Sequence, residues 1–142
     1  MADRRASVVW EGDLFNGQGR ATLESSGLAS DLPVSWPSRT EDPNNQTSPE
    51  ELIAAAHASC FSMALSKQIA DRSGPPERLE TAATVTFVPG EGVTRSALTV
   101  RVTAPGLDEA GLAEAANAAK DGCPVSQALA GNVEITVDAA FA

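Results

Sequence analysis

The clearest hydrophobic pattern in the chain lies between residues 47 and 69, where apolar side chains recur at steps of three and four. This spacing is typical of a helix with one apolar side. Ser48, Pro49 and Glu51 stand where an N-cap, a first helical residue and a capping-box acid are preferred, so a helix start is expected there. The expected apolar stripe consists of Leu52, Ile53, Ala56, Cys60, Met63, Ala64 and the stem of Lys67. We therefore expect Cys60 to be buried or nearly so.

Three further segments alternate between apolar and polar residues, at 83–87, 98–102 and 133–137. Alternation with a period of two predicts strands with one buried and one polar face, and an antiparallel sheet fits these segments best. Residues 108–120 carry acids early and a lysine late, which matches the dipole of a second helix, with Gly122 as its C-cap. The expected fold class is α+β, with helices packed on an antiparallel sheet.

Two short apolar runs near the N-terminus, 7–10 and 20–24, flank an Asn-Gly dipeptide at 16–17. Because this dipeptide favours tight turns between strands, the two runs are predicted to form an opening hairpin. Residues 25–47 then contain three prolines and two consecutive asparagines, which leave room for at most one short strand near Val34. We expect a long, mostly irregular approach to the helix, and long loops in compact domains are usually functional or disordered.

Composition adds limits on domain number and on partners. The 142 residues, 42% of them hydrophobic, suffice for one domain with its own core, so a single domain over 1–142 is expected. Ten basic against nineteen acidic residues give a net charge of -9, which disfavours nucleic acid and membrane surfaces as partners. The longest apolar run, 52–65, is interrupted by polar residues and falls short of the roughly 20 residues that span a bilayer.

The N-terminal residues 1–13 include two arginines but no apolar segment of a secretory signal, so a reducing, cytoplasmic location is expected. A cysteine on a helix is most often a small apolar residue of the core. In a reducing compartment, however, the two cysteines of this chain are more readily explained by thiol chemistry than by a permanent bridge.

The surroundings predicted for the two cysteines differ. Cys123 precedes Pro124, which suits a first helical position, so Cys123 would cap a short helix whose N–H groups lower its pKa. Cys60 lies deep inside its helix and gains nothing from the helix dipole. It needs a nearby cation to ionise at neutral pH, and His57 and Arg39 are the candidates. On these grounds alone, Cys123 is the more acidic thiol.

Four motifs together carry a family resemblance: WEGD near the N-terminus, TSPEEL at the helix start, AAHASCFSMAL around Cys60 and GCPVSQAL around Cys123. From Trp10 to the last strand, the chain resembles the OsmC/Ohr family, and most closely its OsmC branch. The resemblance implies an OsmC-like fold, with antiparallel sheets packed on two central helices in an intertwined homodimer. It also implies a thiol-dependent peroxidase that reduces organic hydroperoxides, and hydrogen peroxide less well, with no cofactor and with an external dithiol or lipoyl-protein reductant.

Residue by residue, the resemblance implies that Cys60 is the peroxidatic cysteine, which forms a sulfenic acid, and that Cys123 resolves it as a disulfide. Arg39 matches the arginine that stabilises the thiolate, and Glu50 matches the glutamate that orients this arginine. These assignments overrule the ranking by acidity. A helix rises about 1.5 Å per residue, so Glu50 and Cys60 would be roughly 15 Å apart on one helix. Either the helix begins later than its capping residues indicate, or Glu50 reaches the site from the partner subunit.

Several residues have a simpler interpretation beside the functional one. His57 is interpreted first as a histidine packed beside Cys60, since a metal site needs more donors than the pattern offers. Trp10, Trp36 and Phe61 are core or interface residues by default, and lining of an alkyl-peroxide pocket is the alternative. For the whole protein, the alternative is a non-catalytic dithiol redox sensor or a stress-associated binding protein. A sensor reacts once with peroxide, whereas an enzyme consumes many equivalents.

Overall fold

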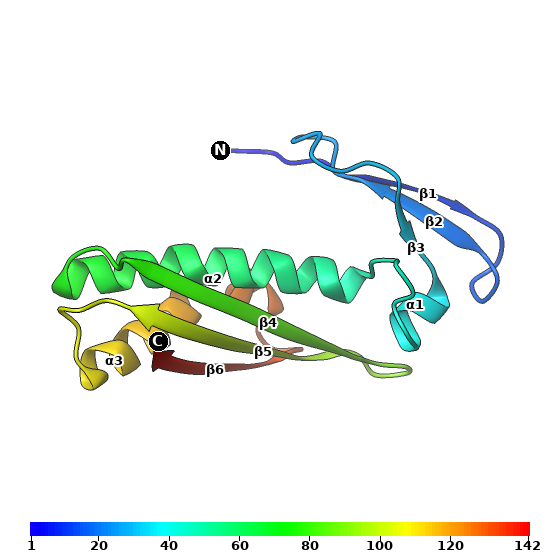
Figure 1. The fold of residues 1–142 in the computed structure, drawn as a ribbon. Coiled ribbons are helices and arrows are strands. Elements are labelled where there is room, and N and C mark those ends of the chain that lie inside the picture. The colour runs from blue at the N-terminus through cyan, green and yellow to red at the C-terminus, as the bar shows by residue number, and fades with distance from the viewer. The chain divides into compact units, whose positions relative to one another are not determined.

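The computed structural model describes residues 1–142, which form two compact units, Met1–Leu52 and Ile53–Ala142 (Figure 1). The first unit contains three strands and one short helix: β1 (Ser7–Glu11), β2 (Gln18–Thr22), β3 (Leu32–Val34) and α1 (Trp36–Thr40). Helix α2 (Pro49–Ser73) leads into the second unit. That unit contains three strands and two further helices: β4 (Arg78–Val88), β5 (Gly92–Thr103), α3 (Glu109–Gly122), α4 (Pro124–Leu129) and β6 (Glu134–Phe141). The assignment of residues 1–142 to a single domain stays a prediction.

The first unit is built on a three-stranded antiparallel sheet in the order β1-β2-β3. Strands β1 and β2 form the predicted opening hairpin, and β3 confirms the short strand expected near Val34. The indole ring of Trp10 lies against β2 at Gly19, where an added Cβ would come within 2.8 Å of the ring. Glycine at this position therefore lets the ring pack directly on the backbone of β2.

Helix α1 lies in the segment that the sequence pattern describes as irregular. Ser35 and Ser38 form a reciprocal capping box at its start, with the Ser38 N–H donating to the Ser35 hydroxyl at 3.2 Å. The Ser35 N–H donates in turn to the Ser38 hydroxyl at 3.1 Å. With five residues, the helix is too short to produce a hydrophobic period, and the prolines around it obscure its capping residues.

The second unit contains a three-stranded sheet in the order β4-β5-β6, and each strand coincides with a predicted one. Strands β4 and β5 pair antiparallel, as expected. Strand β6 pairs parallel with β5, so the expectation of a wholly antiparallel sheet is corrected at this edge. The reason lies in the connection, because α3 and α4 carry the chain back across the sheet before β6 begins. A helical crossover of this kind returns a strand in the same direction.

Helix α2 begins where its capping residues predict. The Ser48 hydroxyl accepts the Glu51 N–H at 3.2 Å, and Pro49 is the first helical residue. The helix ends at Ser73, before the Gly-Pro-Pro sequence at 74–76 that cannot continue it.

Helix α3 also begins as predicted, since the Asp108 carboxylate accepts the Gly111 N–H at 2.7 Å. Its end differs slightly from the expectation. Gly122 is the last helical residue, and the C-cap is Cys123, which at the same time is the N-cap of α4. The two helices therefore meet at this cysteine.

The core of the second unit lies between α2, α3 and one face of β5. Phe61, Leu65 and Ile69 of α2 follow one another at steps of four and have no exposed surface. They pack with Leu98, Val100 and Val102 of β5 and with Leu112, Ala115 and Ala119 of α3. The opposite face of β5 presents exposed polar residues such as Thr99 and Arg101, so the predicted polar outer face is confirmed.

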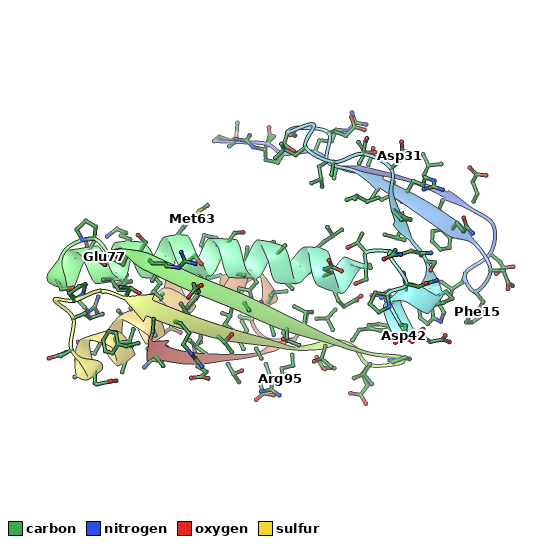
Figure 2. All side chains as sticks on the ribbon, in the orientation of Figure 1. Phe15, Asp31, Asp42, Met63, Glu77 and Arg95 are labelled. Atoms are coloured by element: carbon green, nitrogen blue, oxygen red, sulfur yellow. The ribbon has the colours of Figure 1, made fainter.

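The buried side of α2 is not the predicted stripe. Met63 of that stripe is 73% exposed, Ala56 is exposed too, and Cys60 is only partly buried. Figure 2 shows Met63 pointing away from the β4–β6 sheet. Because α2 is rich in alanine, it has apolar residues on both sides, and spacing alone does not reveal which side faces the core.

The core contains one histidine, His57, which lies one turn before Phe61 and has no exposed surface. Its Nδ1 lies 2.7 Å from the Ser96 hydroxyl of β5, and its Nε2 lies 2.8 Å from the Ser126 hydroxyl of α4. Burial holds the pKa of His57 below its usual value of 6.5, so the ring is neutral at pH 7. The expectation that His57 is a packed histidine is confirmed.

Neutral burial of His57 predicts that the free energy of unfolding falls as the pH drops below about 6.5. The unfolded chain takes up a proton at the usual pKa, whereas the folded chain does so only at lower pH. Protonation therefore favours unfolding in the window below the usual pKa. Since His57 is the only histidine, urea unfolding between about pH 7.5 and about pH 5 should show this slope, and His57→Gln should flatten it. An equally steep slope in His57→Gln would assign the effect to other groups.

Candidate functional site

Cys60 and Cys123, far apart in the sequence, meet in the second unit. Cys60 lies in the middle of α2, and Cys123 lies at the junction of α3 and α4. Both thiols are free, Cys60 packs against the core cluster that contains Cys123, and each thiol shifts the pKa of the other. Cys123 has no exposed surface, whereas Cys60 is partly exposed. In this chain only Cys60 is accessible to a small molecule.

The surroundings of the two thiols shift their acidities in opposite directions. Burial opposes ionisation of Cys123, but hydrogen bonds from the Cys60 thiol, Ser126 and the Val125 N–H outweigh burial and lower the pKa of Cys123. These interactions act although the Cys123 side chain makes no regular capping hydrogen bond. Burial and the neighbouring Cys123 raise the pKa of the Cys60 thiol. Both directions agree with the expectation that Cys123 is the more acidic thiol.

Arg39 and Glu50 form an ion pair in the first unit, between α1 and the first turn of α2. Arg39 donates to Glu50 Oε1 from Nε at 3.0 Å and from Nη2 at 2.8 Å. Its guanidinium carbon lies 5.8 Å from the centroid of the Trp36 ring, within the range of a cation–π interaction. The contact between Arg39 and Glu50 that the resemblance implies is confirmed. The roles of the two residues toward Cys60 stay proposals.

Glu50 is 7% exposed, and Arg39 supplies the positive charge that a buried carboxylate requires. Glu50 Oε2 is buried and has no hydrogen-bond partner, so this oxygen is able to accept a further donor. Helix α2 begins at Pro49, which places Glu50 in its first turn. The alternative in which the helix begins later is therefore wrong.

An apolar cavity of about 380 Å³ opens beside Arg39 within the first unit. Arg39 is its only charged lining residue. The others are Val8, Trp10, Leu14, Ala21, Val34, Ser35, Trp36, Pro49 and Leu52. The two tryptophans of the first unit thus line a cavity, as the alternative interpretation has it, whereas Phe61 belongs to the core of the second unit.

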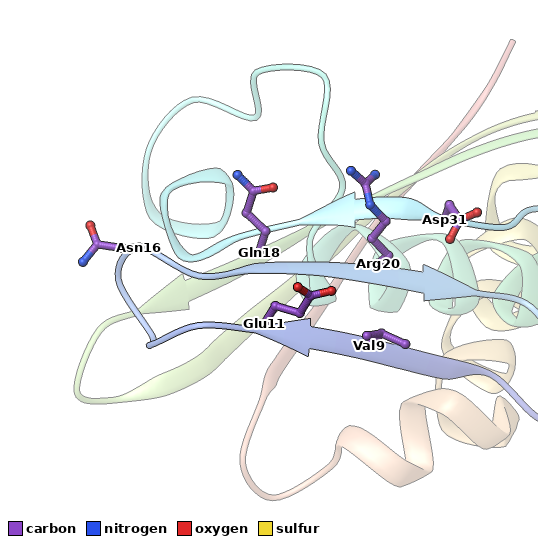
Figure 3. Close-up of a pocket in the computed structure, with 6 residues that line it drawn as sticks. All are labelled: Val9, Glu11, Asn16, Gln18, Arg20 and Asp31. Atoms are coloured by element: carbon purple, nitrogen blue, oxygen red, sulfur yellow. The ribbon is translucent and has the colours of Figure 1, made fainter.

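The other face of the same hairpin is polar. A cavity of about 600 Å³ lies there, lined by Val9, Glu11, Asn16, Gln18, Arg20 and Asp31 (Figure 3). Strand alternation explains the division, because even-numbered residues of β1 face the apolar cavity and odd-numbered residues face the polar one. All six lining residues are exposed, and none is a predicted site residue. The apolar cavity is therefore the better candidate for an organic ligand.

Sequence reasoning does not single out Ser96 or Ser126, the two hydroxyls that hold His57. Ser126 stands within the GCPVSQAL motif, and its closeness to Cys123 in the sequence is the one available signal. Ser96 carries none, because it occupies an apolar position of a strand. No group of three or more His, Cys, Asp and Glu side chains is arranged to hold a metal ion. No helix combines the length and hydrophobicity needed to cross a membrane.

Comparison with known proteins places this geometry in a family. The family model described as OsmC-like protein matches residues 42–138. The chain is 39% identical over 138 residues to the peroxiredoxin OsmC of Escherichia coli (strain K12), covering 95% of this chain and 94% of that protein. It is 31% identical over 122 residues to an organic hydroperoxide resistance protein of Xanthomonas axonopodis pv. citri (strain 306), covering 84% of each.

Solved structures show the same fold. An organic hydroperoxide resistance protein OsmC from Legionella pneumophila matches with a TM-score of 0.70 and 25% identity, over 99% of this chain and 100% of that one. The organic hydroperoxide resistance protein OhrB of Bacillus subtilis matches with a TM-score of 0.68 and 26% identity, over 96% of this chain and 98% of that one. With its sequence, its fold and its paired thiols in agreement, this chain belongs to the OsmC-like protein family.

Proposed function

We propose that this family member is a thiol-dependent peroxidase of organic hydroperoxides, in which Cys60 attacks the peroxide and Cys123 resolves the product. The observation that carries the proposal is the meeting of two free thiols at one core cluster, of which Cys60 is partly exposed and Cys123 fully buried. The names of the relatives, a peroxiredoxin and organic hydroperoxide resistance proteins, support the same activity.

Accessibility decides which thiol attacks. Cys123 has the lower pKa, but a peroxide cannot reach a sulfur without exposed surface. Cys60 is accessible, yet its pKa is raised, and the thiolate is the nucleophile. Cys60 therefore needs an added positive charge, and the family resemblance assigns this role to Arg39, with Glu50 holding the guanidinium.

In the first step, the Cys60 thiolate attacks the distal oxygen of the hydroperoxide. An S–O bond forms, the O–O bond breaks, and the leaving alkoxide takes up a proton to become an alcohol. Cys60 is thereby oxidised to a sulfenic acid.

In the second step, the Cys123 thiolate attacks the sulfur of the Cys60 sulfenic acid. An S–S bond forms, the S–O bond breaks, and the leaving hydroxide takes up a proton to become water. An external dithiol, free or on a lipoyl protein, then reduces the disulfide by exchange and is itself oxidised to a disulfide. The cycle closes without a cofactor.

The apolar cavity beside Arg39 supports an organic substrate. An alkyl chain can bury its apolar surface against Trp10, Val34 and Trp36, whereas hydrogen peroxide has no such surface to bury. Arg39, as the charged lining residue, can donate hydrogen bonds to the peroxide oxygens. Hydrogen peroxide is therefore expected to react less well.

A homodimer would cover the exposed side of α2. On the side opposite Phe61 and Leu65, small or apolar residues follow at steps of three and four: Ala56, Ser59, Met63, Ser66 and Ala70. This spacing suits close packing against a second helix, and a second copy of the chain offers one. Because α2 is helical from Pro49 onward, we favour supply of Arg39 and Glu50 to each Cys60 by the partner subunit.

Treatment with one equivalent of an alkyl hydroperoxide should consume both thiols and form a Cys60–Cys123 disulfide, detectable by peptide mass mapping. With a dithiol reductant present, the protein should consume many equivalents. Cys60→Ser should abolish consumption, whereas Cys123→Ser should attack once and keep sulfenic acid or its over-oxidised products on Cys60. Consumption of a single equivalent would identify the redox sensor instead, and two free thiols after treatment would contradict the mechanism.

Arg39→Ala should raise the pKa of the Cys60 thiol, because the guanidinium that stabilises the thiolate is lost. The measurement is the pH dependence of Cys60 alkylation in a Cys123→Ser background. Alkylation should slow at neutral pH and recover as the pH rises through the new pKa. A rise of about two units corresponds to about 2.7 kcal/mol of lost thiolate stabilisation. Glu50→Gln should act in the same direction but more weakly, because it only loosens the guanidinium.

The matched control for Arg39→Ala is Arg20→Ala, which removes an exposed arginine from the polar face of the same sheet. Its alkylation profile should coincide with that of the parent. If Arg39→Ala also titrates like the parent while His57→Ala shifts, the activating group is the histidine.

Sedimentation at micromolar concentration should show a dimer, and Met63→Lys should shift it toward monomer, because a charge on a packed helix face is costly to bury. Thr84→Lys, on the exposed face of β4, is the control and should leave the dimer intact. A monomeric parent would contradict the homodimer, and a dimeric Met63→Lys would place the interface elsewhere.

A further inference from the structure

Three side chains without a role in the reaction steps, Ser96, His57 and Ser126, are joined by hydrogen bonds into a continuous row next to Cys123. Ser96 and His57 have no exposed surface, and Ser126 is 4% exposed. The Ser96 hydroxyl lies 2.7 Å from His57 Nδ1, and His57 Nε2 lies 2.8 Å from the Ser126 hydroxyl. Ser126 in turn lies in the first turn of α4, whose N-cap is Cys123, and its hydroxyl is one of the groups that lower the pKa of the Cys123 thiol. The row therefore runs from β5 through α2 to α4 and ends on the resolving thiol.

The donors and acceptors available in this row decide its direction when Cys123 is ionised. A thiolate only accepts hydrogen bonds, so the Ser126 hydroxyl donates to Cys123. That hydroxyl has a single proton, so its oxygen must accept from His57, which requires a proton on Nε2. A neutral ring protonated on Nε2 has a bare Nδ1, which accepts the proton of the Ser96 hydroxyl. Every group in the row is then satisfied.

We propose that His57 is a positioning residue for the resolving thiol: its neutral ring, anchored by Ser96, turns the Ser126 hydroxyl toward Cys123 and stabilises the thiolate that attacks the sulfenic acid. The consequence for the resolving step rests on the proposed function, whereas the effect on Cys123 ionisation does not. Burial keeps the ring neutral, as the row requires. The neighbouring groups that shift the pKa of Cys60 are Cys123 and the Val125 N–H, and none of the three residues of the row is among them. The row therefore affects the resolving step and not the attack on peroxide.

No charged side chain competes for this effect on Cys123. The one ionisable group that acts on its acidity is Cys60 of α2. Lys120 and Asp121, at the end of α3, are close in sequence, but neither is among the groups named as shifting the pKa of Cys123. On β5, the residue before Ser96 is Arg95, which is exposed on the other face of the strand. Burial raises the pKa of Cys123, and only hydrogen bonds oppose it, which makes Ser126 a decisive position.

The test is the pKa of Cys123, measured from thiolate ultraviolet absorbance against pH in a Cys60→Ser background. Only one thiol then titrates, and the chain contains no tyrosine to overlap with it. Ser126→Ala and His57→Leu should each raise the pKa of Cys123. His57→Gln, whose side-chain amide can still donate to Ser126, should stay near the parent. If His57→Leu does not fold, Ser96→Ala, which removes the anchor of the ring, takes its place and should also raise the pKa of Cys123.

Ser62→Ala is the matched control, since Ser62 of α2 also hydrogen-bonds a strand, through the Thr81 hydroxyl at 2.7 Å, but lies outside the row. It should leave the pKa of Cys123 unchanged. A parent-like titration of Ser126→Ala would overturn the proposal. An equal rise in Ser62→Ala would also overturn it, because any loosening of the core would then have the same effect. If His57→Gln raised the pKa of Cys123 as much as His57→Leu does, hydrogen-bond donation by the ring would not be the cause, and the proposal would be wrong.

In the protein with both cysteines, Ser126→Ala should lengthen the lifetime of the Cys60 sulfenic acid after one equivalent of tert-butyl hydroperoxide, measured by trapping with a dimedone probe. A pKa rise of about one unit lowers the thiolate fraction, and hence the resolution rate, about tenfold when both pKa values lie above the assay pH. Ser62→Ala should keep the parent lifetime. A parent that consumes no peroxide would refute the proposed function, while the pKa comparison would still decide the role of His57.

Discussion

The burial of one side of α2 against β5 and α3 is the constraint on which the second unit depends. Phe61, Leu65 and Ile69 lie fully inside the core, and truncation of such residues typically costs about 2–5 kcal/mol each. Their packing sets the rotation of the helix, and Cys60, adjacent to Phe61, is held at the edge of the buried side. A shift by one residue turns a helix by about 100°, which would remove Cys60 either from Cys123 or from solvent.

This arrangement gives the lower pKa to Cys123 and the access to solvent to Cys60. The junction of α3 and α4 surrounds Cys123 with hydrogen-bond donors, but the same packing removes it from solvent. Cys60 is partly exposed, lies far from the N-terminus of its helix, and has only the Val125 N–H to lower its pKa. In the proposed mechanism, the order of the two steps follows from access rather than from acidity. In that mechanism the buried Cys123 thiolate attacks the sulfenic acid, and the Cys60 thiol depends on a cation supplied to it.

Helix α2 has two apolar sides that serve different purposes. One side carries large residues and His57, whose ring nitrogens are both satisfied by serine hydroxyls inside the core. The other side carries alanine, serine and Met63, which are small or flexible enough for a second helix to approach closely. The Arg39–Glu50 pair stands at the start of the same helix, beside an apolar cavity. The helix thus connects the core, the thiol pair and the face that we assign to a second subunit.

The sequence by itself determined the elements whose signals are local and the family that its motifs indicate. The cap at Ser48, the alternation of the three strands and the position of Cys123 at a helix start all depend on residues within a few positions of one another. The four motifs together were sufficient for the family, and the resemblance that they carry implied the pairing of Arg39 with Glu50. Only the tertiary structure decided the direction of β6, the buried side of α2 and the row from Ser96 to Cys123. Each of these depends on contacts between residues distant in the chain. An alanine-rich helix has two apolar sides, and only such contacts determine which of them is buried.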